Sequence, residues 1–338
     1  MEKKKMTLYG MIFFICLFLI VTFFFSTNTV NYAVEQQTAE TPEPELAIKT
    51  GLESPLVELE KDSAQETIEL IETEQLDTYF EQIQTMIDKA AADFNGELAV
   101  TYVDTTTGKQ LSVNGKKEFY TASTIKVPLA MMVADRVSEG VFQWDDQVVY
   151  SEENDYEEGT GKLLNDIQPS YSLQTLQEYN ITYSDNIAKN MLYGLFGGDK
   201  QAKRQLYRYF FQREANVEDT QFTSQDGAKI LLKLYREKAD NKEYQKIYDY
   251  MKNTVFHERM ETSLTKGKVA HKIGSYDSFI HDIGILETSH PFVLSIFTNG
   301  KDGSEAISAL TDQLWKMQSE QYPATQATPQ QLIDKTGA

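Results

Sequence analysis

The stretch FYTASTIKVPLAMMVADRVSEG, residues 119–140, decides the fold, because it predicts the passage from a strand into a buried helix. Pro128 is tolerated in the first turn of a helix, and Gly140 is a typical residue just past its end. We expect Thr121 or Ser123 to cap the N-terminus. Apolar residues recur at helical spacing and predict one buried side, formed by Leu129, Met132, Val133 and Val137.

Ser123 and Lys126 lie three residues apart in this stretch and therefore share one face of the predicted helix. A hydroxyl beside an amine is a nucleophile beside a potential base, and the positive end of a helix favours a developing negative charge. The pair alone is weak evidence, because serine is a common cap and lysine is common in helices. Whether this pair is catalytic depends on the motifs in the rest of the chain.

The composition excludes several classes of site. The single cysteine, Cys16, rules out an internal disulfide framework and a cysteine-based metal site among the 338 residues. The four histidines show no metal-ligand spacing, so we expect neither a metal nor a cofactor. Residues 76–322 carry 26 basic and 37 acidic side chains, which argues against a nucleic-acid partner. We expect a monomer.

The N-terminus carries an uncharged apolar run from Leu8 to Phe25, preceded by three lysines, Lys3, Lys4 and Lys5. Eighteen residues of helix span roughly 27 Å, close to the thickness of a bilayer core. We predict a single-pass transmembrane anchor at residues 7–25, with residues 1–6 cytoplasmic and the remainder extracytoplasmic, at the cell membrane. The alternative is a signal cleaved near Ala33, which would give a secreted protein.

The segment after the apolar run is strongly acidic. Residues 26–75 hold twelve Asp or Glu against two Lys, which predicts an extended extracytoplasmic stalk with a potential helix from Ser63. The final residues, 323–338, are rich in Gln, Thr and Pro and are predicted to be disordered. The folded domain is therefore expected at residues 76–322.

The order of elements predicts an α+β fold. A helix at 76–94 and a hairpin of two strands, 97–104 and 109–115, come before the Ser123 helix. Three strands and a closing amphipathic helix end the domain, and between them lie helical patterns at 172–180, 187–198, 200–211, 226–237 and 242–251. We expect an antiparallel sheet of about five strands, flanked by the N- and C-terminal helices, with an inserted all-α subdomain and a cleft between the two parts.

Three short motifs follow one another in the chain: STIK at 123–126, SDN at 184–186 and KIG at 272–274. SxxK, SDN and KTG together are the signature of class A β-lactamases and penicillin-binding proteins. From Leu76 to Met317 the chain resembles this superfamily of serine hydrolases, and the segment GTG at 159–161 resembles one of its small-residue segments. The resemblance implies the β-lactamase and transpeptidase fold.

The resemblance and the chemistry of the residues assign the same catalytic roles. Ser123 Oγ would attack an acyl carbonyl, and Lys126 would accept its proton if burial and Lys272 lower its pKa. Ser184 would relay a proton to the leaving nitrogen, because a hydroxyl can both donate and accept. Lys272 would add positive potential for Ser184 and for a substrate carboxylate.

The expected substrate-binding residues are Asn186, Gly274 and Ser275. Asn186 would bind a substrate amide and steady Lys126. The backbone N–H groups of Ser123 and Ser275 would form an oxyanion hole, where one donor is worth about 3–4 kcal/mol. Each residue also has an ordinary structural explanation, such as a helix cap at residues 184–185 or an edge-strand lysine at position 272.

The chain departs from the superfamily at three places. Its hydrolysing members carry an ExxLN-like segment whose Glu activates the deacylating water, and residues 213–227 show none. Ile273 stands where a hydroxyl residue is usual, and Ser275 is the expected substitute. No arginine lies on the strand 279–287; His281 is near the place of a carboxylate-binding cation, with a solvated strand-edge histidine as the competing expectation.

These observations favour a membrane-anchored extracytoplasmic serine hydrolase resembling class A β-lactamases. β-Lactams or D-Ala-D-Ala-like amides would acylate Ser123, and loss of the acyl group would be slow. Two alternatives stay open. One is a D,D-peptidase or other penicillin-binding protein of cell-wall metabolism, acting on peptidoglycan-like peptides. The other is a non-catalytic wall-binding or sensory module on the same fold.

Overall fold

The computed structural model describes residues 55–322, with side chains from Glu74 onward. The predicted anchor, the first part of the stalk and the tail after Tyr322 lie outside these residues. Within the described part of the chain, no helix is both long enough and apolar enough to cross a membrane.

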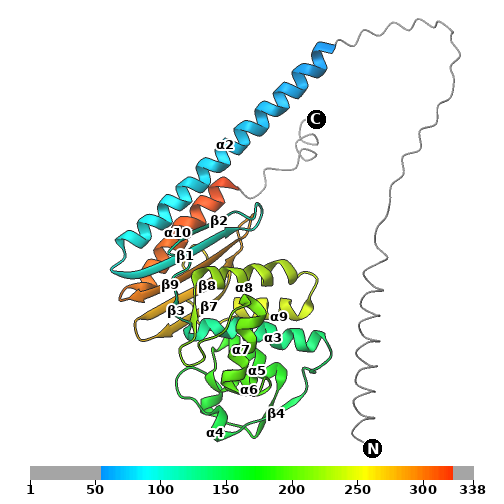
Figure 1. The fold of residues 1–338 in the computed structure, drawn as a ribbon, viewed down its shortest axis with the longest axis vertical. Coiled ribbons are helices and arrows are strands. Elements are labelled where there is room, and N and C mark those ends of the chain that lie inside the picture. The colour runs from blue at the N-terminus through cyan, green and yellow to red at the C-terminus, as the bar shows by residue number, and fades with distance from the viewer. Residues whose placement is uncertain (1–54, 323–338) are drawn as a thin grey trace, which may run out of the picture. The chain divides into compact units, whose positions relative to one another are not determined.

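A five-stranded antiparallel sheet forms the centre of the fold (Figure 1). The strand order is β2-β1-β9-β8-β7, and the strands are β1 (Gly96–Asp104), β2 (Gln110–Val113), β7 (Val269–Tyr276), β8 (Phe279–Leu286) and β9 (Phe292–Gly300). β1 pairs with β9 along its whole length, so the beginning and the end of the domain meet in the middle of the sheet. This confirms the predicted sheet and its strands.

The C-terminal part of α2 (Pro55–Asp93), from Leu76 onward, and α10 (Gly303–Gln321) pack on one face of the sheet (Figure 1). Their apolar side chains pack with those of the strands in one core, which includes Ile83, Ile87, Ile307 and Leu314. The potential helix from Ser63 begins earlier, at Pro55, so the expectation of an extended stalk is wrong over residues 55–62. The reason is local: residues 56–95 contain neither Gly nor Pro and are rich in Glu, Leu and Gln.

The other face carries the inserted helical part. Its helices are α3 (Lys126–Ser138), α4 (Glu152–Asp155), α5 (Leu173–Thr182), α6 (Asn186–Gly194), α7 (Asp199–Phe211), α8 (Ser224–Glu237) and α9 (Lys242–Lys252). Two short ribbons join them, β3 (Phe119–Tyr120) with β6 (Gln221–Phe222), and β4 (Gln147–Val149) with β5 (Ser170–Ser172). The predicted helical insertion is thus confirmed, although the loop-like region before β5 holds short elements.

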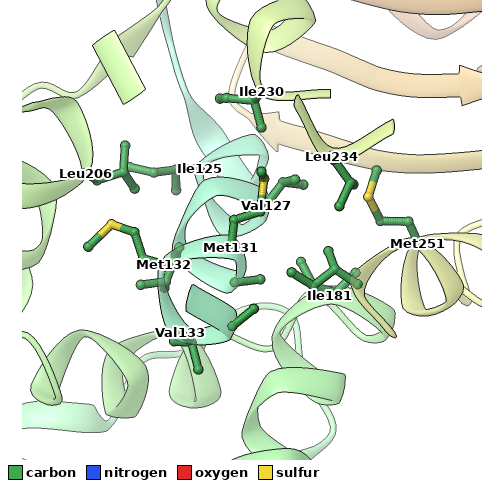
Figure 2. Packing of buried hydrophobic residues seen from close by; sticks show 14 of the residues in the cluster. Ile125, Val127, Met131, Met132, Val133, Ile181, Leu206, Ile230, Leu234 and Met251 are labelled. Atoms are coloured by element: carbon green, nitrogen blue, oxygen red, sulfur yellow. The ribbon is translucent and has the colours of Figure 1, made fainter. Parts of the chain in front are cut away.

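Helix α3 lies in the middle of this insertion. Figure 2 shows its side chains packed among those of α5, α7, α8 and α9, with Ile181, Leu206, Ile230, Leu234 and Met251 labelled. Every residue from Lys126 to Ala134 is buried, so this part of the helix is surrounded on all sides, and the expectation of a single buried side is wrong there; residues 135–138 are half-buried or exposed. The Gly140 stop is confirmed, with φ of 74°. The first helical residue, Lys126, therefore has a rigid support.

Close packing of α8 on the sheet gives a test of the fold. A Cβ at Gly227 would lie 2.4 Å from Ser295 Oγ and 3.1 Å from Ile283 Cγ2. Helix propensity alone favours Ala over Gly by about 1 kcal/mol, whereas overpacking costs about 1–3 kcal/mol. We therefore expect Gly227→Ala to lower the free energy of unfolding by up to about 2 kcal/mol in urea denaturation.

The matched control is the double variant Gly227→Ala with Ser295→Ala, which removes the clashing hydroxyl. It should recover most of the lost stability. A single Gly227→Ala variant that unfolds at higher urea than the parent protein would contradict the close approach of α8 to β9.

Candidate active site

Ser123 lies in a tight turn that joins β3 to α3. The turn is a 3₁₀ helix, Ala122–Ile125, and no side chain caps it, so the expectation of a cap at Thr121 or Ser123 is wrong. Thr121 instead acts through its backbone, donating its N–H to the Thr220 carbonyl at 3.0 Å. Ala122 has φ of 44°, a conformation that is strained for a residue with a Cβ. The Ser123 side chain is thereby left to line a cavity.

Lys126 begins α3 and is 1% exposed. Its Nζ donates to Asn186 Oδ1 at 2.8 Å, to the Ser184 carbonyl at 2.5 Å and to Ser184 Oγ at 3.2 Å. Burial lowers the pKa of this amine well below its usual value, and the charge of Lys272 lowers it further. A lysine of lowered pKa can be neutral near pH 7 and accept a proton.

Ser184 occupies the sharp break between α5 and α6, with φ of 50°. The next residue, Asp185, caps α6 by accepting the N–H of Ala188 at 2.9 Å. One carboxylate oxygen of Asp185 also accepts the N–H groups of Lys162 and Leu163, at 2.7 and 2.8 Å. Asp185 therefore fastens the 159–163 segment to the break that carries Ser184.

Glycine is required in this segment because Asp185 lies so close. A Cβ at Gly161 would lie 2.5 Å from the Asp185 carboxylate, and its φ of 147° disfavours other residues. Thr160 completes the connection: its carbonyl accepts the Asn186 N–H at 3.0 Å, and its hydroxyl donates to the Ser184 carbonyl at 2.7 Å. The sequence singled out this segment only by resemblance, and the structure shows what it holds in place.

Lys272, on strand β7 of the sheet, contacts the Ser184 hydroxyl. Its Nζ donates to Ser184 Oγ at 2.9 Å and to the Ile273 carbonyl at 2.8 Å, and the residue is 1% exposed. Burial lowers the pKa of Lys272 to about 7, although the Asp282 carboxylate acts in the opposite direction. The Ser184 hydroxyl thus lies between two buried amines, which suits it to pass protons.

The predicted substrate-binding residues border the cavity. It measures about 470 Å³, and its lining includes Ser123, Lys126, Ser184, Asn186 and Ser275. Gly274 lies against the nucleophile, because a Cβ there would be 3.2 Å from the Ser123 backbone nitrogen. The structure therefore brings all seven predicted residues together from three separate parts of the chain.

Arg259 was missed by the sequence analysis. It is buried, and its guanidinium donates to the carbonyls of Gly274 and His281, at 3.0 and 2.7 Å, and to Ser275 Oγ at 2.6 Å. It precedes β7 in an irregular segment with no motif, so no local pattern could have found it. Arg259 supplies positive charge beside Ser275.

His281 fits neither of its expected roles. It is fully buried on β8, an inner strand, so it is not a solvated strand-edge residue. Its Nδ1 accepts the Thr298 N–H at 3.2 Å, and its Nε2 donates to the Tyr120 carbonyl at 2.8 Å. Burial lowers the pKa of His281 to about 4, which keeps it neutral at pH 7 and excludes a carboxylate-binding cation.

Four carboxylates line the cavity: Glu157, Glu158, Asp199 and Glu258. Three of them have a cationic partner: Glu157 lies 2.8 Å from Lys189, Asp199 lies 2.8 Å from Lys203, and Glu258 lies 3.3 Å from the Arg259 guanidinium. Burial opposes ionisation of Glu157, but Lys189 outweighs it and lowers the pKa of this carboxyl. From the segment where the ExxLN-like glutamate was sought, the cavity receives Thr220.

Comparison with known proteins agrees with this geometry. The sequence profile of the Beta-lactamase enzyme family matches residues 79–318. The extended-spectrum β-lactamase PER-1 of Pseudomonas aeruginosa is 25% identical over 223 residues, which cover 58% of this chain and 72% of PER-1.

Solved structures share the fold. A mutant of PBP-A, determined as its acyl-enzyme complex with penicillin-G, superposes with a TM-score of 0.63 at 22% identity, covering 72% of this chain and 97% of that one. A β-lactamase from Sphaerobacter thermophilus gives 0.61 at 21% identity, covering 72% and 98%. Because the family profile spans most of the sequence, this chain belongs to the β-lactamase enzyme family and is a serine hydrolase.

Proposed function

We propose that this protein forms a long-lived acyl-enzyme at Ser123 with β-lactams and with D-Ala-D-Ala-like amides, as a penicillin-binding protein does. The observation that carries the proposal is the position of the Ser184 hydroxyl, 2.9 Å from Lys272 Nζ and 3.2 Å from Lys126 Nζ at the cavity that Ser123 lines. A proton can move between two amines and a hydroxyl without any carboxylate.

Acylation would proceed in two proton transfers. Ser123 Oγ attacks the carbonyl carbon while the neutral amine of Lys126 takes the hydroxyl proton. When the tetrahedral intermediate collapses, the C–N bond breaks, Ser184 donates its proton to the leaving nitrogen, and the Lys126 ammonium returns a proton to Ser184. The products are an ester at Ser123 and a free amine or opened ring. Lys272 and Arg259 add positive potential for a substrate carboxylate.

Slow hydrolysis of the ester follows from the state of the carboxylates. A deacylating water needs a base whose proton affinity is not already satisfied. Of the four carboxylates that line the cavity, Glu157 and Asp199 have a lysine partner at 2.8 Å and Glu258 has Arg259 at 3.3 Å, while the lowered pKa of Glu157 makes it a weaker base. None of the four comes from residues 213–227, where the glutamate of the hydrolysing members was sought. This supports a persistent acyl-enzyme over rapid turnover, and so a penicillin-binding protein over a fast β-lactamase.

We also propose that the domain is extracytoplasmic and tethered to the cell membrane. The apolar run Leu8–Phe25 behind Lys3, Lys4 and Lys5 supports this location, as does a reaction whose substrates belong to the cell wall.

Labelling with a fluorescent penicillin tests the proposed acylation. The parent protein should take one label, located at Ser123 by mass spectrometry, and the label should persist after free penicillin is removed. Ser123→Ala should reduce labelling by at least about a thousandfold, because the nucleophile is gone. Ser138→Ala, an exposed serine at the end of the same helix, is the matched control and should label normally. A label lost within seconds would favour a β-lactamase, and Ser123-independent labelling would refute the mechanism.

The pH dependence of acylation should follow the two lysines. Lys126 must be neutral and Lys272 charged, so the rate should rise from acid pH and then fall as Lys272 loses its proton above its pKa of about 7. The measurement is the second-order labelling rate between about pH 5 and about pH 9. Lys272→Arg keeps its charge throughout and should remove the alkaline fall, although at a lower rate. A parent rate that stays flat above pH 7 would contradict this role of Lys272.

Fractionation of cells tests the tether. The full chain should sediment with membranes after a carbonate wash, whereas a variant lacking residues 1–33 should stay in the supernatant. Recovery of the full chain in the soluble extracytoplasmic fraction, shortened near Ala33, would favour the cleaved signal instead.

A further inference from the structure

Two buried titratable side chains, on the active-site strand β7 and its neighbour β8, do not line the cavity. Side chains alternate between the two sides of a strand. On β7, Ala270 packs in the core of the helical insertion and Val269 in the core beneath α2 and α10, so His271 lies on the same side as Val269. Asp282 stands opposite Ile273 in the β7–β8 register, on that same side. His271 is 1% exposed and Asp282 is 0% exposed.

Asp282 and His271 are joined to each other and to the segment that enters β7. His271 Nδ1 lies 2.9 Å from Asp282 Oδ2 and 3.1 Å from Oδ1, so Nδ1–H donates to the carboxylate. Asp282 Oδ2 also accepts the Met260 N–H at 3.0 Å. The other ring nitrogen of His271 has no hydrogen-bond partner among the described residues. His271 therefore makes its only polar contact within the described chain with Asp282.

The segment that Asp282 holds carries Arg259. Arg259 has φ of 60°, a strained conformation for a side chain of this size. Three hydrogen bonds fix it there: Met260 N–H to Asp282, Ser308 Oγ to the Arg259 carbonyl at 2.9 Å, and Thr265 Oγ1 to the Met260 carbonyl at 2.6 Å. Among the three, only the bond to Asp282 involves a charge, and charged hydrogen bonds are the stronger kind.

Asp282 also acts on Lys272 through its charge. Two charges act on the Lys272 ammonium: Arg259 disfavours it and Asp282 favours it. Lys126 is a third neighbouring amine, because its Nζ contacts the same Ser184 hydroxyl as Lys272. On its own side of the sheet, His271 faces the carboxylates of Asp282 and, more distantly, Glu261. Asp282 thus acts on both cations, on Lys272 through its charge and on Arg259 through the neighbouring Met260 N–H, whereas the guanidinium of Arg259 is itself paired with Glu258 at 3.3 Å.

We propose that Asp282, oriented by His271, is the positioning residue for the cationic half of the active site. It holds Arg259 in the strained conformation that presents the guanidinium to Ser275, and its negative charge favours the ammonium form of Lys272. Neither Asp282 nor His271 lines the cavity. The inference rests on the proposed function only in that acylation is the readout.

The decisive variant is Asp282→Asn, which removes the charge but keeps an oxygen that can accept the Met260 N–H. Without the carboxylate, Lys272 loses its proton at lower pH, so the alkaline fall of the labelling rate should move down by about one pH unit. The rate at pH 7 should fall about fivefold, because the protonated fraction of Lys272 drops from about a half to about a tenth. Ser308→Ala is the matched control: it loosens the same backbone without changing charge, and should leave the position of the fall unchanged. An unchanged profile in Asp282→Asn would overturn the proposal.

A second pair of variants tests the orientation by His271. His271→Leu removes the donor to Asp282, whereas His271→Gln keeps one. The leucine variant should lower the acylation rate several-fold and glutamine should restore most of it; equal rates in both variants and the parent would refute the part assigned to His271.

Thermal unfolding of the full chain against pH gives a readout without penicillin. The folded pKa of Lys272, about 7, lies below its unfolded value of about 10.4, so the unfolded chain binds more protons in that window and stability rises with pH across it. In Asp282→Asn the rise should begin at lower pH. A parent protein that takes no penicillin label would refute the proposed function. Thermal unfolding would still decide the role of Asp282, because a rise in stability that begins at the same pH in Asp282→Asn as in the parent would refute that role.

Discussion

The site depends on one arrangement, a single hydroxyl held between two buried amines. Ser184 Oγ is within 3.2 Å of Lys126 Nζ and 2.9 Å of Lys272 Nζ. Burying an unpaired ammonium is strongly unfavourable, so two lysines in one dry site cannot both keep ordinary pKa values. The structure meets this constraint by giving Lys126 three oxygen acceptors and by lowering the pKa of both amines. Burial therefore accounts both for the lowered pKa values of these amines and for their ability to exchange protons with Ser184.

This arrangement explains why the backbone is strained where it is. Ala122, Ser184 and Arg259 all have positive φ, and each immediately precedes or forms part of the site. Such conformations persist only where the surroundings fix them. Here the surroundings are the Thr121–Thr220 backbone bond, the Asp185 cap with its bonds to residues 162 and 163, and the Asp282 carboxylate beneath β7. The buried helix α3 provides the fixed reference for all of them.

The sequence could predict what local patterns encode. Periodicity gave the sheet strands and the inserted helices, and three motifs gave the residues that converge on Ser184. Arg259 escaped because its role comes from a positive φ and from contacts with distant residues, neither of which leaves a pattern. His281 was misjudged for a similar reason, since the burial of a histidine on an alternating strand depends on its pairing with β9 and on β3 above it. The helical residues 55–62 were missed because acidic composition was weighed above good helix formers.

The placement of charge also explains how the cavity can attract an anion while being made partly of acids. Three of the four carboxylates that line it have a cationic partner: Glu157 with Lys189, Asp199 with Lys203, and Glu258 with Arg259. Asp282 is fully buried and does not line the cavity. From there it favours the charged form of Lys272 through the low-dielectric interior, yet leaves the cavity side of this cation to a substrate carboxylate. Inside the cavity, Asp282 would compete with the substrate for Lys272 and would offer a further base to water. Its burial outside the cavity supports acylation without promoting deacylation.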